Sequence, residues 1–357
     1  MKLSFVTLLL FPLLLAASPL LANDSAHEVS IQTPDPEVSL AGTLLLPESP
    51  RGNTVVLLIT GSGDHVRDAV ISGTPMFRLI AEDLAVAGIA SLRLDDRGTG
   101  DSTGPTTSES TTADRVVDMR AALQWLRNND VTSFKRIGLI GHSEGAGIAL
   151  RLAAAEDAPD FAVILGTPVH KGIDVWVDQQ LAGFRQGVGI DDAAILDQVR
   201  IRLEQAARLS IDGADAQAMR ENNIALFALG GVDVSDEEGQ PMLDGFIGRM
   251  TDPWMRHFLA DDPGEVLDRI TIPILAVYGS HDRLTSPRQN ATTLVEGLIA
   301  AGNPDLTLRI LPDQEHFFLR LPGEPVGTHR FGEMELSAEL LELQRSWILD
   351  RATADQP

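Results

Sequence analysis

The chain contains no cysteine, and only 5% of its 357 residues are aromatic. Without a thiol there can be no disulfide, no thiolate metal ligand and no lipid on an N-terminal cysteine. The eight histidines are scattered and form no His-Glu-x-x-His pattern, so we expect no metal. So few aromatic side chains also argue against a large exposed face for lipids.

Positive charge is scarce as well. The 28 Lys and Arg residues stand against 51 Asp and Glu residues, which gives a net charge of −23. Phosphate contacts need a basic surface, so we expect no nucleic-acid partner, and an anionic membrane surface is disfavoured. A small-molecule substrate is the expected partner, and the composition does not indicate an oligomeric state.

Long apolar runs are missing except at the N-terminus, where Lys2 precedes an apolar stretch at 3–15. Small residues follow it, with a plausible cleavage junction after Ala22. This layout predicts a signal peptide over 1–22, hence an exported protein, periplasmic or secreted, with no stable membrane anchor after cleavage. A membrane anchor is the alternative, but Pro12 and Pro19 interrupt a run already short for a span.

Beyond residue 23, short apolar runs rich in β-formers alternate with helical patterns. Such alternation predicts the α/β class, with a mostly parallel central sheet covered by helices on both faces and an antiparallel start. We expect strands at 28–33, 38–46, 54–60, 89–95, 137–142, 161–166, 272–279 and 306–311, and helices at 75–87, 113–128 and 145–155.

Residues 167–270 break this alternation because no convincing strand occurs there. The pattern predicts helices at 173–186, 191–209, 215–229 and 253–259. We therefore expect a helical cap inserted at 167–270 into a core made of 23–166 and 271–357. Such a cap would cover the edge where open α/β sheets place their sites, although the helices could instead be scaffold only.

Gly141-His142-Ser143-Glu144-Gly145 is the most informative motif of the chain. It lies between an expected strand and an expected helix, which is the context of a nucleophile elbow. A serine there occupies a strained turn with its hydroxyl exposed at the end of the sheet. A Cβ at Gly141 or Gly145 would collide with the neighbouring strand or helix.

A serine hydroxyl needs a base to take its proton, and the base needs an orienting acid. After such an elbow the acid and then the base should each follow a later strand. Asp282 and His316 occupy those two places. His281 and His329 are rivals for the base and Asp313 for the acid, and Asp282 could alternatively be a turn or N-cap residue.

Acyl transfer also needs donors for the developing oxyanion. We assign them to the backbone N–H groups of Glu144 and Ser62, with Gly61 as the neighbouring possibility for the second. The Gly-Ser-Gly segment at 61–63 is a poor dinucleotide loop because Val66 stands where a third glycine should be. We therefore expect no cofactor.

Four segments together resemble the α/β-hydrolase superfamily, in particular secreted bacterial serine esterases of the serine aminopeptidase-like and dienelactone-hydrolase-like branches. The resemblance runs from about residue 43 to the C-terminus, is weakest in the cap, and implies the α/β-hydrolase fold with serine-hydrolase chemistry. Similar sequences usually carry a proline where Asp64 stands. Their histidine motif often begins with glycine or asparagine, whereas 313–316 begins with Asp313. The matching segments are 58–63 with Arg67 and Asp68, 94–102, 137–145 and 279–282.

Dehalogenases and epoxide hydrolases of this fold carry an aspartate at the elbow, so Ser143 argues against both. The residues predict a serine carboxylesterase acting on short- to medium-chain esters. The alternatives are a serine peptidase or amidase, which could hold an ammonium group with Glu237, Glu238 or Asp244, and a non-catalytic binding protein. Arg97 is expected to hold loops together rather than to contact the substrate.

Large apolar residues of the cap could form the acyl pocket together with Gly61. We expect most of them to be ordinary cap core. The candidates are Trp176, Phe184, Phe246, Trp254, Met255 and Phe258.

Overall fold

The computed structural model describes residues 25–185, 189–234 and 236–352. The predicted signal peptide lies outside these residues, as does the last residue of the helix expected at 173–186. Within the described ranges, no helix combines the length and the apolar character needed to cross a membrane.

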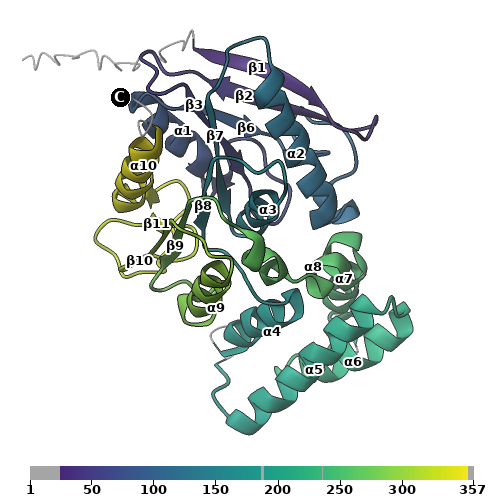
Figure 1. The fold of residues 1–357 in the computed structure, drawn as a ribbon. Coiled ribbons are helices and arrows are strands. Elements are labelled where there is room, and N and C mark those ends of the chain that lie inside the picture. The colour runs from purple at the N-terminus through teal and green to yellow at the C-terminus, as the bar shows by residue number, and fades with distance from the viewer. Residues whose placement is uncertain (1–24, 186–188, 235, 353–357) are drawn as a thin grey trace, which may run out of the picture.

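An eight-stranded sheet forms the centre of the molecule (Figure 1). Strand β2 runs antiparallel to both of its neighbours, whereas the other neighbouring pairs are parallel. The predicted α/β class with an antiparallel start is therefore confirmed. In spatial order the strands are β1 (Ala26–Gln32), β2 (Ser39–Leu45), β6 (Ala90–Leu94), β3 (Thr54–Ile59), β7 (Arg136–His142), β8 (Phe161–Leu165), β9 (Ile274–Gly279) and β10 (Leu306–Leu311).

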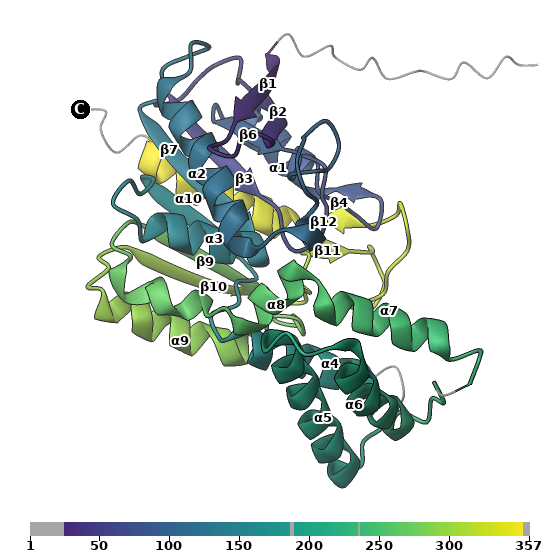
Figure 2. The ribbon, with the colours of Figure 1, turned by 90° about the vertical axis from the view of Figure 1, so that its right-hand side faces the viewer.

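Helices cover both faces of this sheet (Figures 1 and 2). Because side chains alternate along a strand, Val55 and Leu57 of β3 join one apolar cluster, while Val56 and Leu58 join the other. The first cluster includes residues of α2 (Thr112–Asn128), α3 (Glu144–Ala153) and α9 (Pro287–Ala300). The second includes residues of α1 (Met76–Val86) and α10 (Ala338–Ala352).

The structure contains two core helices, α9 and α10, and several small elements that the sequence analysis did not predict. The small elements lie in the connections around the sheet: the strand pairs β4 (Val70–Ile71) with β5 (Thr74–Pro75) and β11 (Leu319–Arg320) with β12 (Glu335–Leu336), and the 3₁₀ turn η1 (Thr107–Glu109).

Among the described residues between β8 and β9 there are five α-helices and a 3₁₀ segment, which have an apolar cluster of their own. Four lie where the sequence predicts helices. Helix α7 was missed, because two glycines within it, Gly245 and Gly248, weaken the helical pattern. The elements are α4 (Gly172–Gly183), α5 (Ala193–Ile211), α6 (Ala216–Leu229), α7 (Gln240–Thr251), α8 (Pro253–Ala260) and η3 (Pro263–Arg269).

The chain enters and leaves this helical group at one place. The N–H of Gly172, at the start of α4, donates a 2.8 Å hydrogen bond to the carbonyl oxygen of Asp261, just after α8. A Cβ at Gly172 would lie 1.6 Å from the carbonyl oxygen of Phe258, so only glycine permits this approach. Asp261 also pairs with Arg151 of α3 at 2.5 Å, which joins this entry and exit point of the helical group to the core.

Candidate active site

Ser143 lies at a strained turn between β7 and α3. Its φ of 55° and ψ of −120° are rare for a residue with a side chain. A Cβ at Gly141 would lie 2.3 Å from the carbonyl oxygen of Gly145, and a Cβ at Gly145 would lie 2.2 Å from that of Ile59. The collisions expected at both flanking positions are therefore confirmed, and the turn has the geometry of a nucleophile elbow.

His316 and Asp282 come together from the loops after β10 and β9. The His316 Nδ1 lies 2.9 Å from Asp282 Oδ2, and both residues are only 3% exposed. Burial raises the pKa of Asp282, but the charge of His316 and hydrogen bonds from His316 and Thr285 outweigh it and hold that pKa below its usual value. The carboxylate therefore keeps its charge and can accept from the imidazole.

The two oxygens of Asp282 have different tasks. Oδ1 accepts hydrogen bonds from the backbone N–H groups of Leu284 and Thr285, at 2.9 and 2.8 Å, which closes a turn after β9. Oδ2 lies 2.8 Å from the Thr285 hydroxyl in addition to its contact with His316. One side chain thus makes both the turn contacts and the contact with His316 that the sequence analysis treated as alternatives. Thr285, which the sequence analysis missed, supports both.

The rival residues lie elsewhere. His281 is exposed and its Nδ1 lies 3.0 Å from the Ser280 hydroxyl. His329 Nε2 is 4.0 Å from Glu315, and Asp313 is an exposed turn residue with φ of 54°. None of the three lines the cavity that Ser143 and His316 share.

His142, beside the elbow serine, supports the loop that carries His316. Its Nε2–H donates a 3.0 Å hydrogen bond to the backbone oxygen of His316, and the two rings are 4.8 Å apart. Burial, together with the nearby His316, lowers the pKa of His142 to about 3. His142 is therefore neutral near pH 7 and acts as a fixed donor.

The loop after β3 reaches the elbow and is fastened by Arg115 of α2. Arg115 Nη1 donates to the carbonyl oxygen of Gly61 at 2.9 Å, and Nη2 donates to that of Thr60 at 3.0 Å. Since the C=O and N–H of a trans peptide point in opposite directions, the Ser62 N–H is directed away from Arg115. Gly61 and Ser62 both line the cavity beside Ser143.

The side chain of Glu144 is a second anchor of the elbow. It is 5% exposed, and Arg115 Nη1 lies 3.2 Å from its Oε2. Its Oε1 accepts a 2.6 Å hydrogen bond from the Thr112 hydroxyl and a 3.1 Å bond from the indole N–H of Trp254 in α8. One carboxylate thus links the elbow, α2 and the helices between β8 and β9.

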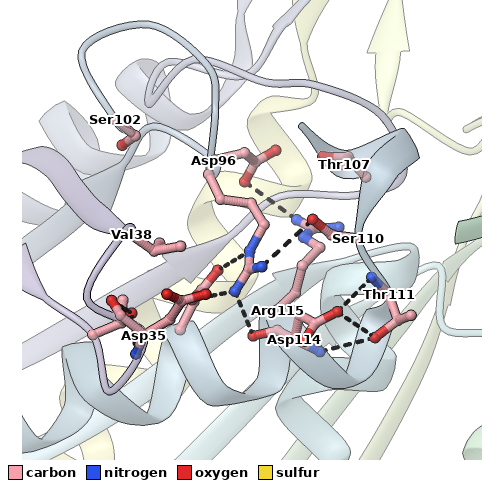
Figure 3. Close-up of polar contacts among 12 residues, drawn as sticks. Asp35, Val38, Asp96, Ser102, Thr107, Ser110, Thr111, Asp114 and Arg115 are labelled. Carbon is pink, nitrogen blue, oxygen red and sulfur yellow. Dashed lines mark hydrogen bonds and ion pairs between the residues drawn. The ribbon is translucent and has the colours of Figure 1, made fainter. Parts of the chain in front are cut away.

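Asp96 and Asp64 fasten the same loop to its neighbours. Asp96 Oδ1 accepts from the Thr60 hydroxyl at 2.6 Å and lies 3.3 Å from Arg115, a contact visible in Figure 3. Asp64, which stands in place of the usual proline, accepts from the Thr107 N–H at 2.8 Å. Hydrogen bonds to neighbouring loops thus take over the constraint that a proline would supply.

Arg97 is tied into the loop structure, as the sequence predicts. Its Nε and Nη2 donate to the two carboxylate oxygens of Asp118 at 2.7 and 2.8 Å, and Nη2 also reaches the Asp114 carbonyl oxygen. Figure 3 labels Ser110, Asp114 and Arg115 in this region. Arg97 is buried and is not among the residues that line the cavity.

A cavity of about 490 Å³ opens beside Ser143 and His316. Five of the six large cap residues proposed for the pocket line it, and Phe184 does not. Five of the six also pack in or against the apolar cluster of the helices between β8 and β9, and Trp254 is the exception. Lining the cavity and packing in this cluster therefore occur together in the same side chains. The rings of Trp254 and Phe258 stack with centroids 5.2 Å apart. The five that line the cavity are Trp176, Phe246, Trp254, Met255 and Phe258.

Among the described residues, no group of three or more His, Cys, Asp or Glu side chains is arranged to hold a metal ion. Glu144, His142 and His316 have hydrogen-bond partners within the protein that hold them beside Ser143. Their arrangement suits general-base catalysis by His316 and nucleophilic attack by Ser143.

Residues 54–319 match the family described as the alpha/beta hydrolase fold, which is most of the chain. The chain belongs to this family. The match spans the elbow, Asp282, His316 and the helices between β8 and β9, so the expected superfamily is confirmed.

This α/β-hydrolase is 21% identical over 310 residues to esterase EstD of Thermotoga maritima. The alignment covers 87% of the chain and 65% of EstD, so the chain spans less than two thirds of that relative. Esterase Pf2001 of Pyrococcus furiosus has a TM-score of 0.54, with 19% identity and 82% of each chain covered. Proline iminopeptidase of Mycobacterium smegmatis has a TM-score of 0.51, with 14% identity and 92% and 98% covered. At these identities the two structures establish a common fold.

Proposed function

We propose that this α/β-hydrolase is a serine carboxylesterase that cleaves short- to medium-chain carboxylic esters through an acyl-enzyme. The observation that carries the proposal is that the strained Ser143 and His316 line one cavity, with His316 Nδ1 2.9 Å from Asp282 Oδ2. The esterase names of EstD and Pf2001 support the same reaction class.

In the first half-reaction, His316 Nε2 takes the hydroxyl proton of Ser143 while the serine oxygen attacks the ester carbonyl carbon. Asp282 stabilises the imidazolium through Nδ1–H. The backbone N–H groups of Ser62 and Glu144 donate to the oxyanion of the tetrahedral intermediate. His316 then gives its proton to the leaving alcohol as the C–O bond breaks, which leaves an acyl group on Ser143.

In the second half-reaction, His316 removes a proton from water, and the hydroxide oxygen attacks the acyl carbon. The second tetrahedral intermediate uses the same two donors. Its collapse returns the proton to the Ser143 oxygen and releases the carboxylic acid. The balance is one ester and one water for one acid and one alcohol.

The cavity favours an ester over a peptide with a free N-terminus. An aminopeptidase needs a free carboxylate near its nucleophile, and Glu237, Glu238 and Asp244 are not among the lining residues. Asp244 is instead paired with Arg220. Glu144, the one carboxylate among the described lining residues, already accepts from Thr112, Arg115 and Trp254.

The size and lining of the cavity support the chain-length range. A volume of about 490 Å³ is typical of a small-molecule site, and its walls are largely apolar. We also propose export of the protein, from the layout of residues 1–22. N-terminal sequencing of the mature protein from periplasm and medium tests this, with a start at Met1 as the contrary result.

The deciding experiment is hydrolysis of a p-nitrophenyl ester series from acetate to palmitate, with Ser143→Ala as the matched blank. We expect turnover of the shorter chains that is lost in Ser143→Ala. Amino-acid anilides run in parallel, and turnover confined to them would replace the esterase with a peptidase. Failure of Ser143 to react with a fluorophosphonate, together with no turnover, would indicate a binding protein.

A further inference from the structure

Arg249, near the end of α7, stands out among the residues around the cavity. It is exposed at the cavity and is the one Lys or Arg among the described lining residues. Phe246 and Met250, three positions before it and one after, line the cavity too. Residues spaced by three and four share one face of a helix, so this face of α7 is turned toward the cavity.

The charge of Arg249 is not compensated by the lining. In the part of the lining that the structure describes, Glu144 is the one acidic residue, and its carboxylate is occupied by Arg115, Thr112 and Trp254. His142 is neutral near pH 7 because its pKa is lowered to about 3, by burial above all.

Arg249 also differs from Arg220, an arginine of the adjacent helix α6, in having no acidic partner among the residues that the structure describes. Arg220 of α6 pairs with Asp244 of α7, whereas no hydrogen bond or ion pair joins the Arg249 guanidinium to a described residue. Asp252 is near enough to respond to its charge: burial raises the pKa of Asp252 and Arg249 partly offsets that rise. The two are not within the 4.0 Å of an ion pair, so the guanidinium keeps its donors free.

A free guanidinium beside apolar walls matches a ligand with an apolar chain and an anionic end. Arginine presents paired donors that fit a carboxylate in a bidentate manner. Phe246, Met250 and Met255 supply apolar surface next to it. The net charge of −23 makes such a local cation informative, because the rest of the protein repels anions.

We propose that Arg249 selects half-esters of dicarboxylic acids, in which a free carboxylate and the ester group share one aliphatic chain. This inference rests on the proposed esterase function and names its substrate class. Arg249 binds the free carboxylate, the chain lies along the apolar wall, and the ester carbonyl reaches Ser143. Uncharged esters of the same length lack the first contact.

The test compares monoethyl esters from succinate to suberate with ethyl esters from butyrate to octanoate, matched in acyl length, by ethanol release. The quantity measured is the ratio of kcat/KM for each acid–neutral pair. We expect Arg249→Gln to lower this ratio about threefold to fivefold, the size of an exposed ion pair. The effect should shrink at 1 M salt, where the screening length is about 3 Å.

Two further variants sharpen the comparison. Arg249→Lys keeps the charge and should retain part of the preference. Arg208→Gln makes the same charge change on an exposed position of α5 outside the cavity lining and should leave the ratio unchanged. A ratio that does not respond to Arg249→Gln, or that responds equally to Arg208→Gln, overturns the inference while the esterase stands.

A binding measurement keeps the two proposals separable. If no ester is turned over, the esterase proposal fails, and binding of monoethyl adipate to Ser143→Ala by calorimetry then decides the role of Arg249. Binding that weakens in the Ser143→Ala/Arg249→Gln double variant supports the anion site. Equal binding by both proteins overturns it.

Discussion

Arg115 donates a 2.9 Å hydrogen bond to the carbonyl oxygen of Gly61, on the opposite side of the peptide from the Ser62 N–H. The positive charge polarises that peptide and strengthens its N–H as a donor. The same nitrogen lies 3.2 Å from the Glu144 carboxylate, so one guanidinium fixes both residues that we assign as oxyanion donors.

Arg115→Lys keeps the charge but loses the forked geometry. Because both assigned donors would shift, we expect kcat on p-nitrophenyl acetate to fall about tenfold to a hundredfold with little change in KM, somewhat less than the loss of a donor. Arg97→Lys is the matched control, since Arg97 is also buried and forked but binds Asp118 instead of Gly61 and Glu144. Equal losses of kcat in both variants would contradict the special role of Arg115.

Trp254→Phe removes the indole N–H that reaches Glu144 and keeps an aromatic ring beside Phe258. A hydrogen bond to a charged group contributes about 1.5–3 kcal/mol, so we expect a loss of unfolding free energy near the lower end of that range. Urea unfolding measures it. Trp176→Phe changes the same cavity wall without touching Glu144. If this variant loses as much unfolding free energy as Trp254→Phe, packing alone explains the loss.

Thr285→Val removes the hydroxyl that lies 2.8 Å from Asp282 Oδ2 and 3.2 Å from His316 Nδ1. We expect kcat to fall roughly tenfold because the acid and base lose part of their orientation. Thr285→Ser retains the hydroxyl and should recover most of the rate. A Ser variant as slow as the Val variant would assign the defect to packing instead.

His142 makes the folded state sensitive to acid. Its pKa is about 3 in the folded protein and about 6.5 in an unfolded chain, so the unfolded state binds the extra proton as pH falls below 6.5. At pH 5 this costs about 2 kcal/mol of unfolding free energy relative to pH 7 and above.

His142→Gln removes this titration and keeps an amide that can donate toward His316. Between pH 7 and pH 5 its unfolding free energy should therefore fall less than that of the natural protein, by about the same 2 kcal/mol. Denaturant melts at the two pH values supply the comparison. Parallel pH curves for the two proteins would refute the assignment. Asp282 does not interfere, because its pKa is lowered and the stability that its charge contributes is therefore lost only below the range from pH 5 to pH 7.

The sheet was predictable because β-rich apolar runs alternate with helices in simple order. Asp282 and His316 were predictable as candidates because each directly follows a strand, and parallel strands end at the same edge. Helix α7 was not, since Gly245 and Gly248 weaken its pattern and its stability comes from packing against neighbouring helices.

The support around the site could not be predicted for a different reason. Trp254 and Glu144 are 110 positions apart, and Arg115 and Gly61 are 54 apart. No local pattern marks either pair, because each contact exists only after the sheet and helices are packed. Thr285, in contrast, lies three residues after Asp282, and an Asp followed by Thr at that spacing is a recognisable turn signal.

The hydrogen bond from Gly172 to Asp261 has a consequence for how such a protein can change over time. A stretch of chain whose two ends meet can grow, shrink or be exchanged without stretching the strands on either side. Most of the aromatic wall of the cavity and Arg249 belong to this stretch, whereas Ser143, Asp282 and His316 do not. The choice of substrate can therefore diverge by exchange of the helical segment at this one place, while the groups to which we assign the reaction are inherited intact.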